Sequence, residues 1–154
     1  MLPLKKKKMQ AYILTLHILA ATVWTGGHLI LAIAILPQIL KKRDVKGLID
    51  FETKYEKIGM PALVIQVVTG IYLVYNLVPD VSRWFSFSDY FTNTIGVKLI
   101  LLLITVLFAL SAKLFVIPKL SNKNLNVMAF HIISVTIISV LFVIIGSSFK
   151  NAIF

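Results

Sequence analysis

Four long apolar runs, separated by short polar connectors, dominate this chain of 154 residues. Each run is about as long as the ~20 apolar residues that a helix needs to cross the hydrocarbon core of a bilayer. None of the four contains Asp or Glu, and together they leave little room for a soluble domain. The sequence therefore predicts an all-α fold, an integral membrane four-helix bundle forming a single transmembrane domain over residues 1–154. The predicted spans are residues 11–36, 58–78, 95–117 and 127–149.

Composition supports a membrane protein and excludes several kinds of site. Hydrophobic residues make up 58% of the chain, against about 45–50% in soluble domains. The absence of Cys excludes disulfides, iron–sulfur clusters and thiolate metal sites. The net charge of +10 comes mainly from Lys and Arg at the ends of the runs, where membrane proteins carry them. We therefore expect the lipid bilayer, and no nucleic acid, as a partner, in a multi-pass protein of a cell membrane of the bacterial inner-membrane type.

Prolines and polar segments predict where the spans end. Pro37, Pro79 and Pro118 are expected to stop the first three spans, and Pro61 to lie in the first turn of the second. Residues 38–57 read as a charged, part-helical connector that extends the spans into water. Residues 80–94 interleave five aromatic residues with Ser and Asp, which predicts a segment lying in the bilayer interface. A lid over a ligand is the alternative for this segment.

Three histidines lie inside the apolar runs, namely His17, His28 and His131. A protonatable side chain is costly in lipid, so an intramembrane histidine suggests a functional site, and neutral imidazole is a common ligand for metals and haem iron. His17 and His28 are eleven residues apart, a net rotation of about 20°, so they share one helix face with Trp24. Gly27, beside His28, leaves space for a flat ligand or a close helix approach.

Depth in the membrane suggests how these side chains pair. We call the membrane face at the N-terminus face A and the opposite one face B. His28 and His131 come out at comparable depths near face B, which predicts that they ligate one b-type haem. His17 and Lys98 come out at similar depths near face A and form a weaker second site, where Lys98 would be a second ligand, a partner for a haem propionate or a snorkelling cation. The ordinary alternative for each histidine is a hydrogen bond to a neighbouring helix. The candidate cofactor-binding residues are thus His28, His131, His17, Lys98, Trp24 and Gly27, with the three histidines as metal ligands.

Several short motifs resemble the copper-resistance D (CopD) family, whose wider group includes the HemJ-type protoporphyrinogen oxidases. They are Leu16-His17-Ile18, Trp24-Thr25-Gly26-Gly27, Leu36-Pro37, Met60-Pro61-Ala62, Thr69-Gly70 and Val97-Lys98-Leu99. The resemblance implies a four-helix membrane bundle. Its HemJ branch implies bound haem b, with functional roles at His17 and Lys98, and its CopD branch implies a link to copper. His28 and His131 depart from the HemJ pattern and favour a CopD-like protein or a dedicated b-type cytochrome.

The sequence thus predicts a membrane-embedded b-type haem protein that transfers one electron at a time, similar to a cytochrome b. Its partners would be a quinol or small reductant and a redox partner protein; whether it is itself a haem-dependent oxidoreductase stays open. Copper binding or transport is the alternative, because imidazole and thioether groups of Met60, Met128, His28 and His131 fall toward face B and suit Cu(I). A HemJ-like protoporphyrinogen oxidase is the second alternative. The small bundle also fits a homo-oligomer or a subunit of a larger complex.

Overall fold

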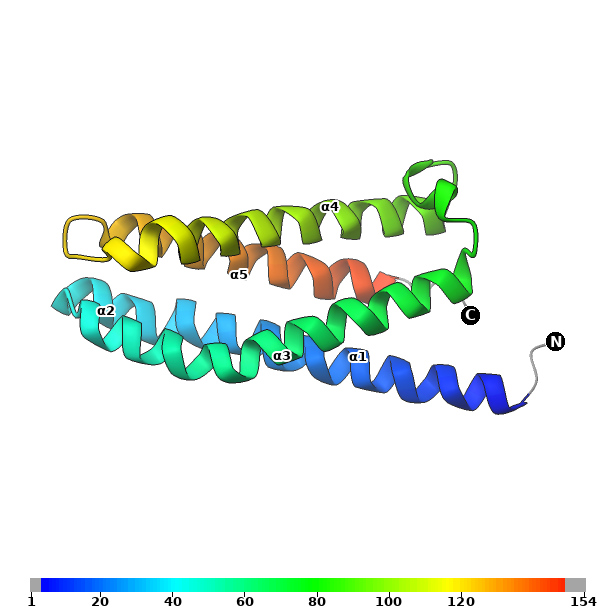
Figure 1. Ribbon diagram of the computed structural model, residues 1–154, viewed down its shortest axis with the longest axis horizontal. Helices are drawn as coiled ribbons and strands as arrows, with labels where there is room; N and C mark the ends of the chain where they lie inside the picture. The colour runs from blue at the N-terminus through cyan, green and yellow to red at the C-terminus, as the bar shows by residue number, and fades with distance from the viewer. Residues whose placement is uncertain (1–3, 149–154) are drawn as a thin grey trace.

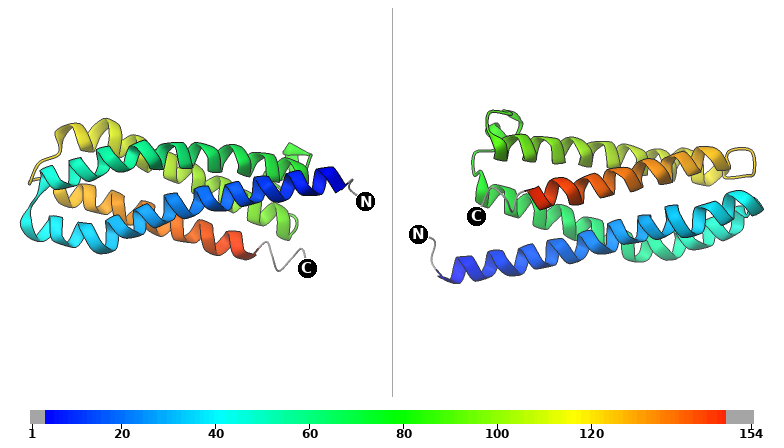
Figure 2. Two further views of the ribbon diagram at one scale, coloured as in Figure 1. Left: turned by 90° about the horizontal axis from the view of Figure 1, so that it is seen from below. Right: turned by 180° about the vertical axis from the view of Figure 1, so that it is seen from behind.

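Two antiparallel helical hairpins lie side by side and form an elongated bundle (Figures 1 and 2). The structure is a computed structural model that describes residues 4–148. Four of its helical rods are long and apolar enough to cross a membrane, which confirms the predicted all-α four-helix bundle. The first rod packs against the second and the fourth, and the third packs against the fourth. The predicted end of span four, Phe149, lies outside the described residues.

The first rod runs straight through the proline that was predicted to end it. It consists of α1 (Leu4–Ile30), a π-helical segment η1 (Leu31–Ile35) and α2 (Leu36–Lys42). Pro37 lies in the first turn of α2, where its missing N–H costs little. In the wider π turn before it, the N–H of Leu36 donates to the carbonyl of Leu31. The prediction that the span stops at Pro37 is therefore wrong.

The second rod, α3 (Val45–Leu77), is much longer than the predicted second span. Asp44 begins it, because its Oδ1 accepts from the N–H of Gly47 at 2.9 Å. Most of the predicted connector at residues 38–57 is therefore helical, and Pro61 lies inside α3 rather than in its first turn. A helix of 33 residues measures about 50 Å, longer than the ~30 Å hydrocarbon core. The charged start of α3 thus lies alongside the end of the first rod, and α3 stops before Pro79 as expected.

The second hairpin repeats this construction. Its first rod is α4 (Tyr90–Ser111), a π-helical segment η3 (Ala112–Val116) and a 3₁₀ turn η4 (Ile117–Lys119), and α5 (Leu125–Ser148) returns along it. The rod continues one residue past Pro118, so the predicted end is nearly right. The best-buried core lies at face B, where both hairpins turn. It comprises Leu31, Leu36, Ile39, Leu48, Val116, Leu125, Met128, Ala129 and Ile132.

The aromatic segment between the hairpins folds onto the start of α4. It contains the 3₁₀ turn η2 (Val81–Phe85), beside the α4 end in Figure 1. Trp84 Nε1–H donates to the carbonyl of Val78 at 2.9 Å. The ring of Phe87 occupies the space where a Cβ at Gly96 would lie, 2.7 Å from Phe87 Cε1. These contacts are with the end of α3 and the start of α4, and not with the helix that carries His17, so they favour the interfacial reading over a lid.

Asp89 caps α4, and its ionisation is expected to make the stability of this end depend on pH. Its Oδ1 accepts from the backbone N–H of Thr92 at 2.9 Å, and its Oδ2 pairs with Arg83 at 2.8 Å. The backbone hydrogen bond from Thr92, followed by that from Phe91 and by the charge of Arg83, holds the pKa of Asp89 below its ordinary value. A lowered carboxyl pKa stabilises the fold above the unfolded value of about 4, and this contribution is lost as the pH falls through the folded value.

We expect Asp89→Ala to lower the thermal unfolding temperature at pH 7 and to have a smaller effect near pH 3, below the unfolded-state pKa of about 4, where part of the contribution of the ionised cap is lost. Asp50→Ala, on the exposed side of α3, is the control. A loss of stability that is the same at both pH values would contradict an ionised cap.

Candidate functional site

His17 is held against α3 by one hydroxyl. Its Nδ1 lies 2.9 Å from Thr69 Oγ1, whose own hydrogen bond to the carbonyl of Ile65 measures 2.6 Å. The hydroxyl group of Thr69 has a single hydrogen, and it donates that hydrogen to the Ile65 carbonyl, which can only accept. The hydroxyl oxygen must therefore accept from the Nδ1–H of His17. The other ring nitrogen of neutral His17, Nε2, then carries the lone pair, and it has no hydrogen-bond partner within residues 4–148.

His28 also carries its ring hydrogen on Nδ1, and here the acceptor is a backbone carbonyl of its own helix, α1. Its Nδ1 lies 2.9 Å from the carbonyl of Trp24, which can only accept, so Nδ1 carries the hydrogen and Nε2 the lone pair. The hydroxyl of Tyr55 on α3 donates to the same carbonyl at 2.9 Å. The rings of Trp24 and Tyr55 lie 4.3 and 5.5 Å from the His28 ring, centroid to centroid, so they wall it on two sides.

The two glycines before His28 have different roles. A Cβ at Gly27 would overlap the Tyr55 ring, and one at Gly59 on α3 would lie 2.9 Å from Tyr55 Cε1. Tyr55 therefore fills a slot between two glycines, and Gly27 serves the close approach of α1 and α3. A Cβ at Gly26 would meet nothing within 4 Å. Of the two readings that the sequence left open for this pair, the structure shows a helix contact at Gly27.

The structure does not bring His28 and His131 into one pocket. His131 Nδ1–H donates to the carbonyl of Val127 at 2.9 Å, and Ser111 Oγ lies 3.0 Å from Nε2. Its ring packs at right angles to those of Phe108 and Phe130, with centroids 5.4 and 6.1 Å away. His131 thus bridges α5 to α4, and both of its nitrogens are already hydrogen-bonded.

Lys98, the residue that the sequence pairs with His17, lies on α4 and contacts α5. Lys98 lies close enough to His17 for their charges to interact, and a Cβ at Gly146 on α5 would lie 3.3 Å from Lys98 Nζ. A Cβ at Gly70 on α3 would lie 3.1 Å from His17 Cε1. Small residues therefore admit His17 between α1 and α3 and Lys98 between α4 and α5. One turn before Gly70, the buried Oε1 of Gln66 has no hydrogen-bond partner within residues 4–148.

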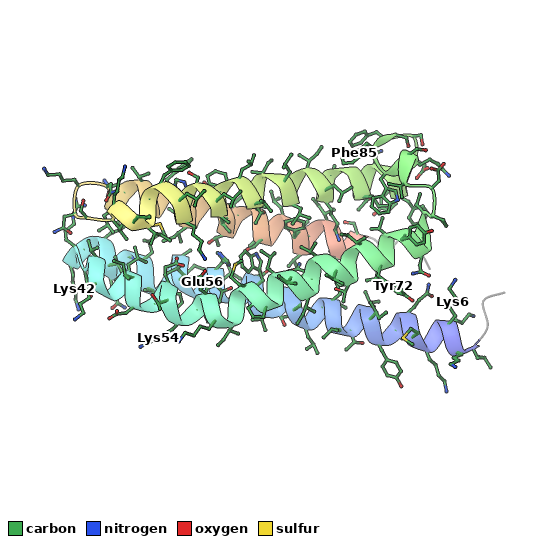
Figure 3. All side chains as sticks on the ribbon, in the orientation of Figure 1. Lys6, Lys42, Lys54, Glu56, Tyr72 and Phe85 are labelled. Atoms are coloured by element: carbon green, nitrogen blue, oxygen red, sulfur yellow. The ribbon has the colours of Figure 1, made fainter. Side chains whose placement is uncertain are left out.

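The sequence did not predict one ion pair that the structure shows. Glu56 on α3 and Lys113 in the π-helical segment η3 form an ion pair that joins the two hairpins, and Figure 3 shows Glu56 directed from α3 toward α4. The sequence pattern puts Glu56 in the connector at residues 38–57 and Lys113 in the apolar run at residues 95–117. The sequence signal was the lysine itself, an intramembrane cation that needs an acidic partner.

The described residues contain single imidazole donors rather than a preformed metal cluster. Within residues 4–148, no group of three or more His, Asp or Glu side chains could hold a metal ion. Two cavities, of about 130 and 280 Å³, lie at the ends of the bundle, and neither is lined by a histidine. Of the two methionines of the copper reading, Met128 is 2% exposed in the face-B core and Met60 is 41% exposed.

The imidazole groups of His17 and His28 nevertheless have the form expected of an iron ligand. A neutral histidine that donates Nδ1–H to a protein acceptor, as His17 and His28 do, is the usual form of a metal-bound imidazole. The two nitrogens are separated by about 16 Å of helix rise, too far to share one metal. A scan of protein-family models, a search of curated proteins and a search of solved structures find no match to this chain.

Proposed function

We propose that this chain is a membrane-embedded b-type haem protein that transfers single electrons, with His17 and His28 as the iron ligands. The observation that supports the proposal is the protonation pattern of the two α1 histidines, whose Nε2 lone pairs have no hydrogen-bond partner in the described part of the chain. His131 is the weaker candidate, because an iron would have to displace Ser111 from its Nε2.

Each histidine would serve its own haem. His17 lies toward face A and His28 toward face B, about 16 Å apart along one helix. Haem iron would supply the one-electron redox chemistry. The protein's part is to present a neutral imidazole, to exclude water and to place the cation of Lys98 where it can pair with an anionic propionate at the His17 site. The resemblance to the CopD and HemJ group is consistent with this reading and supplies the copper alternative.

The test is the colour and metal content of the protein purified from membranes of cells supplied with haem precursors and copper. We expect an intense Soret band, reduced α and β bands, and about two haems per chain. A colourless preparation that carries stoichiometric copper would overturn the proposal in favour of copper binding. A colourless preparation without copper would overturn both metal readings.

A further inference from the structure

We propose that Thr69 is a positioning residue that fixes the proton of His17 on Nδ1 and so presents Nε2 as a lone-pair donor. That this lone pair binds iron rests on the proposed function, whereas the position of the proton does not. The inference starts from the number of bonds a hydroxyl can make, which is one as donor and two as acceptor.

Thr69 Oγ1 has three polar neighbours. They are the carbonyl oxygens of Ile65 at 2.6 Å and Gln66 at 3.2 Å and the Nδ1 of His17 at 2.9 Å. An oxygen–oxygen distance of 2.6 Å is at the short end of the O–H···O range, so the single hydroxyl hydrogen lies between Thr69 and Ile65. The opposite arrangement, with Thr69 donating to His17, would leave two oxygens in contact at 2.6 Å without a hydrogen between them. Nδ1 of His17 is therefore the donor.

The surroundings make this hydroxyl hard to replace. The side chain of Thr69 is buried, with 8% of its surface exposed, so water has little access to it. Gly70 lets the His17 ring approach α3 closely, because a Cβ at Gly70 would be 3.1 Å from His17 Cε1. An imidazole N–H in an apolar environment without an acceptor would cost about 1–3 kcal/mol. Within residues 4–148 Thr69 Oγ1 is the side-chain acceptor in hydrogen-bond distance of Nδ1, and the backbone of Gln66 is the second acceptor near the ring. The proton is thus expected to favour Nδ1 while Thr69 offers its oxygen.

The chain has three histidines in all, which makes the proton directly observable. We suggest labelling the full-length protein with ¹⁵N-histidine, removing any bound haem because iron on Nε2 would itself hold the hydrogen on Nδ1, and reading the protonation of each ring nitrogen by NMR in phosphatidylcholine nanodiscs. His17→Gln assigns the His17 signals. The test pair is Thr69→Val, which keeps the shape and removes the hydroxyl, and Thr69→Ser, which keeps the hydroxyl. His28 is an internal control, because its acceptor is the backbone carbonyl of Trp24.

The expected result is an Nδ1–H form of His17 in the wild type and in Thr69→Ser. Thr69→Val should move the proton to Nε2 in most molecules and leave the His28 signals unchanged. A wild-type His17 protonated on Nε2, or a folded Thr69→Val that keeps the wild-type pattern, would overturn the proposal. If Thr69→Val fails to fold, Thr69→Ala is judged by the same criterion. Protein purified without haem from cells supplied with haem precursors would contradict the proposed function alone, since the NMR measurement is made on haem-free protein.

Discussion

Gly27→Ala is expected to lower the free energy of unfolding by about 1–3 kcal/mol, the usual cost of forcing an extra carbon into a packed interior. The added methyl group would overlap the Tyr55 ring, which Gly59 confines from the other side. The ring cannot move aside without breaking the bond from the Tyr55 hydroxyl to the Trp24 carbonyl. Unfolding of the detergent-solubilised protein, followed by circular dichroism, would measure the effect.

Gly26→Ala is the matched control, because a Cβ there has open space around it. Replacing a helical glycine by alanine without a clash should stabilise the helix by about 0.5–1 kcal/mol. Combining Gly27→Ala with Tyr55→Ala should cost less than the two single changes together, because the colliding ring is gone. Equal effects of the two alanine substitutions, or strict additivity in the double variant, would contradict the proposed slot.

His17→Gln and His28→Gln are each expected to remove about half of the bound haem, because each would eliminate one of two iron ligands. His131→Gln should leave the haem content unchanged, since that side chain is hydrogen-bonded to Ser111 and Val127. Haem per chain, determined by extraction and compared with protein mass, is the measurement. Wild-type haem content in both α1 variants, or a complete loss in His131→Gln, would favour the ligand set first inferred from the sequence.

The stripe on the first helix could be predicted because α1 is an unbroken α-helix as far as Ile30. His17, Trp24 and His28 therefore keep the expected 100° per residue, and all three meet α3 or its side chains. The pairing of His28 with His131 rested on depth alone. Depth along a helix does not determine which way a side chain points around its axis.

On α5, the hydroxyl of Thr136 bonds the carbonyl of His28, so that side of the helix meets α1. His131 lies five residues earlier, about 140° away around the axis, and meets α4 instead. No pattern within one run can supply this rotation, because it depends on how the helices pack. The same is true of Glu56 and Lys113, which are 57 positions apart in sequence.

The two π-helical turns have a consequence for how the halves of the chain correspond. Leu31 and Ala112, which begin these turns, are 81 positions apart, and so are Pro37 and Pro118. The first rods of both hairpins also run in the same direction (Figure 1). The two hairpins thus share the spacing of a π-helical turn and a proline, and the same offset of 81 positions separates His17 from Lys98. The proposed face-A site therefore combines residues at equivalent positions of the two hairpins. The first hairpin supplies an imidazole and the second an ammonium group, so the two sides of the site differ in charge.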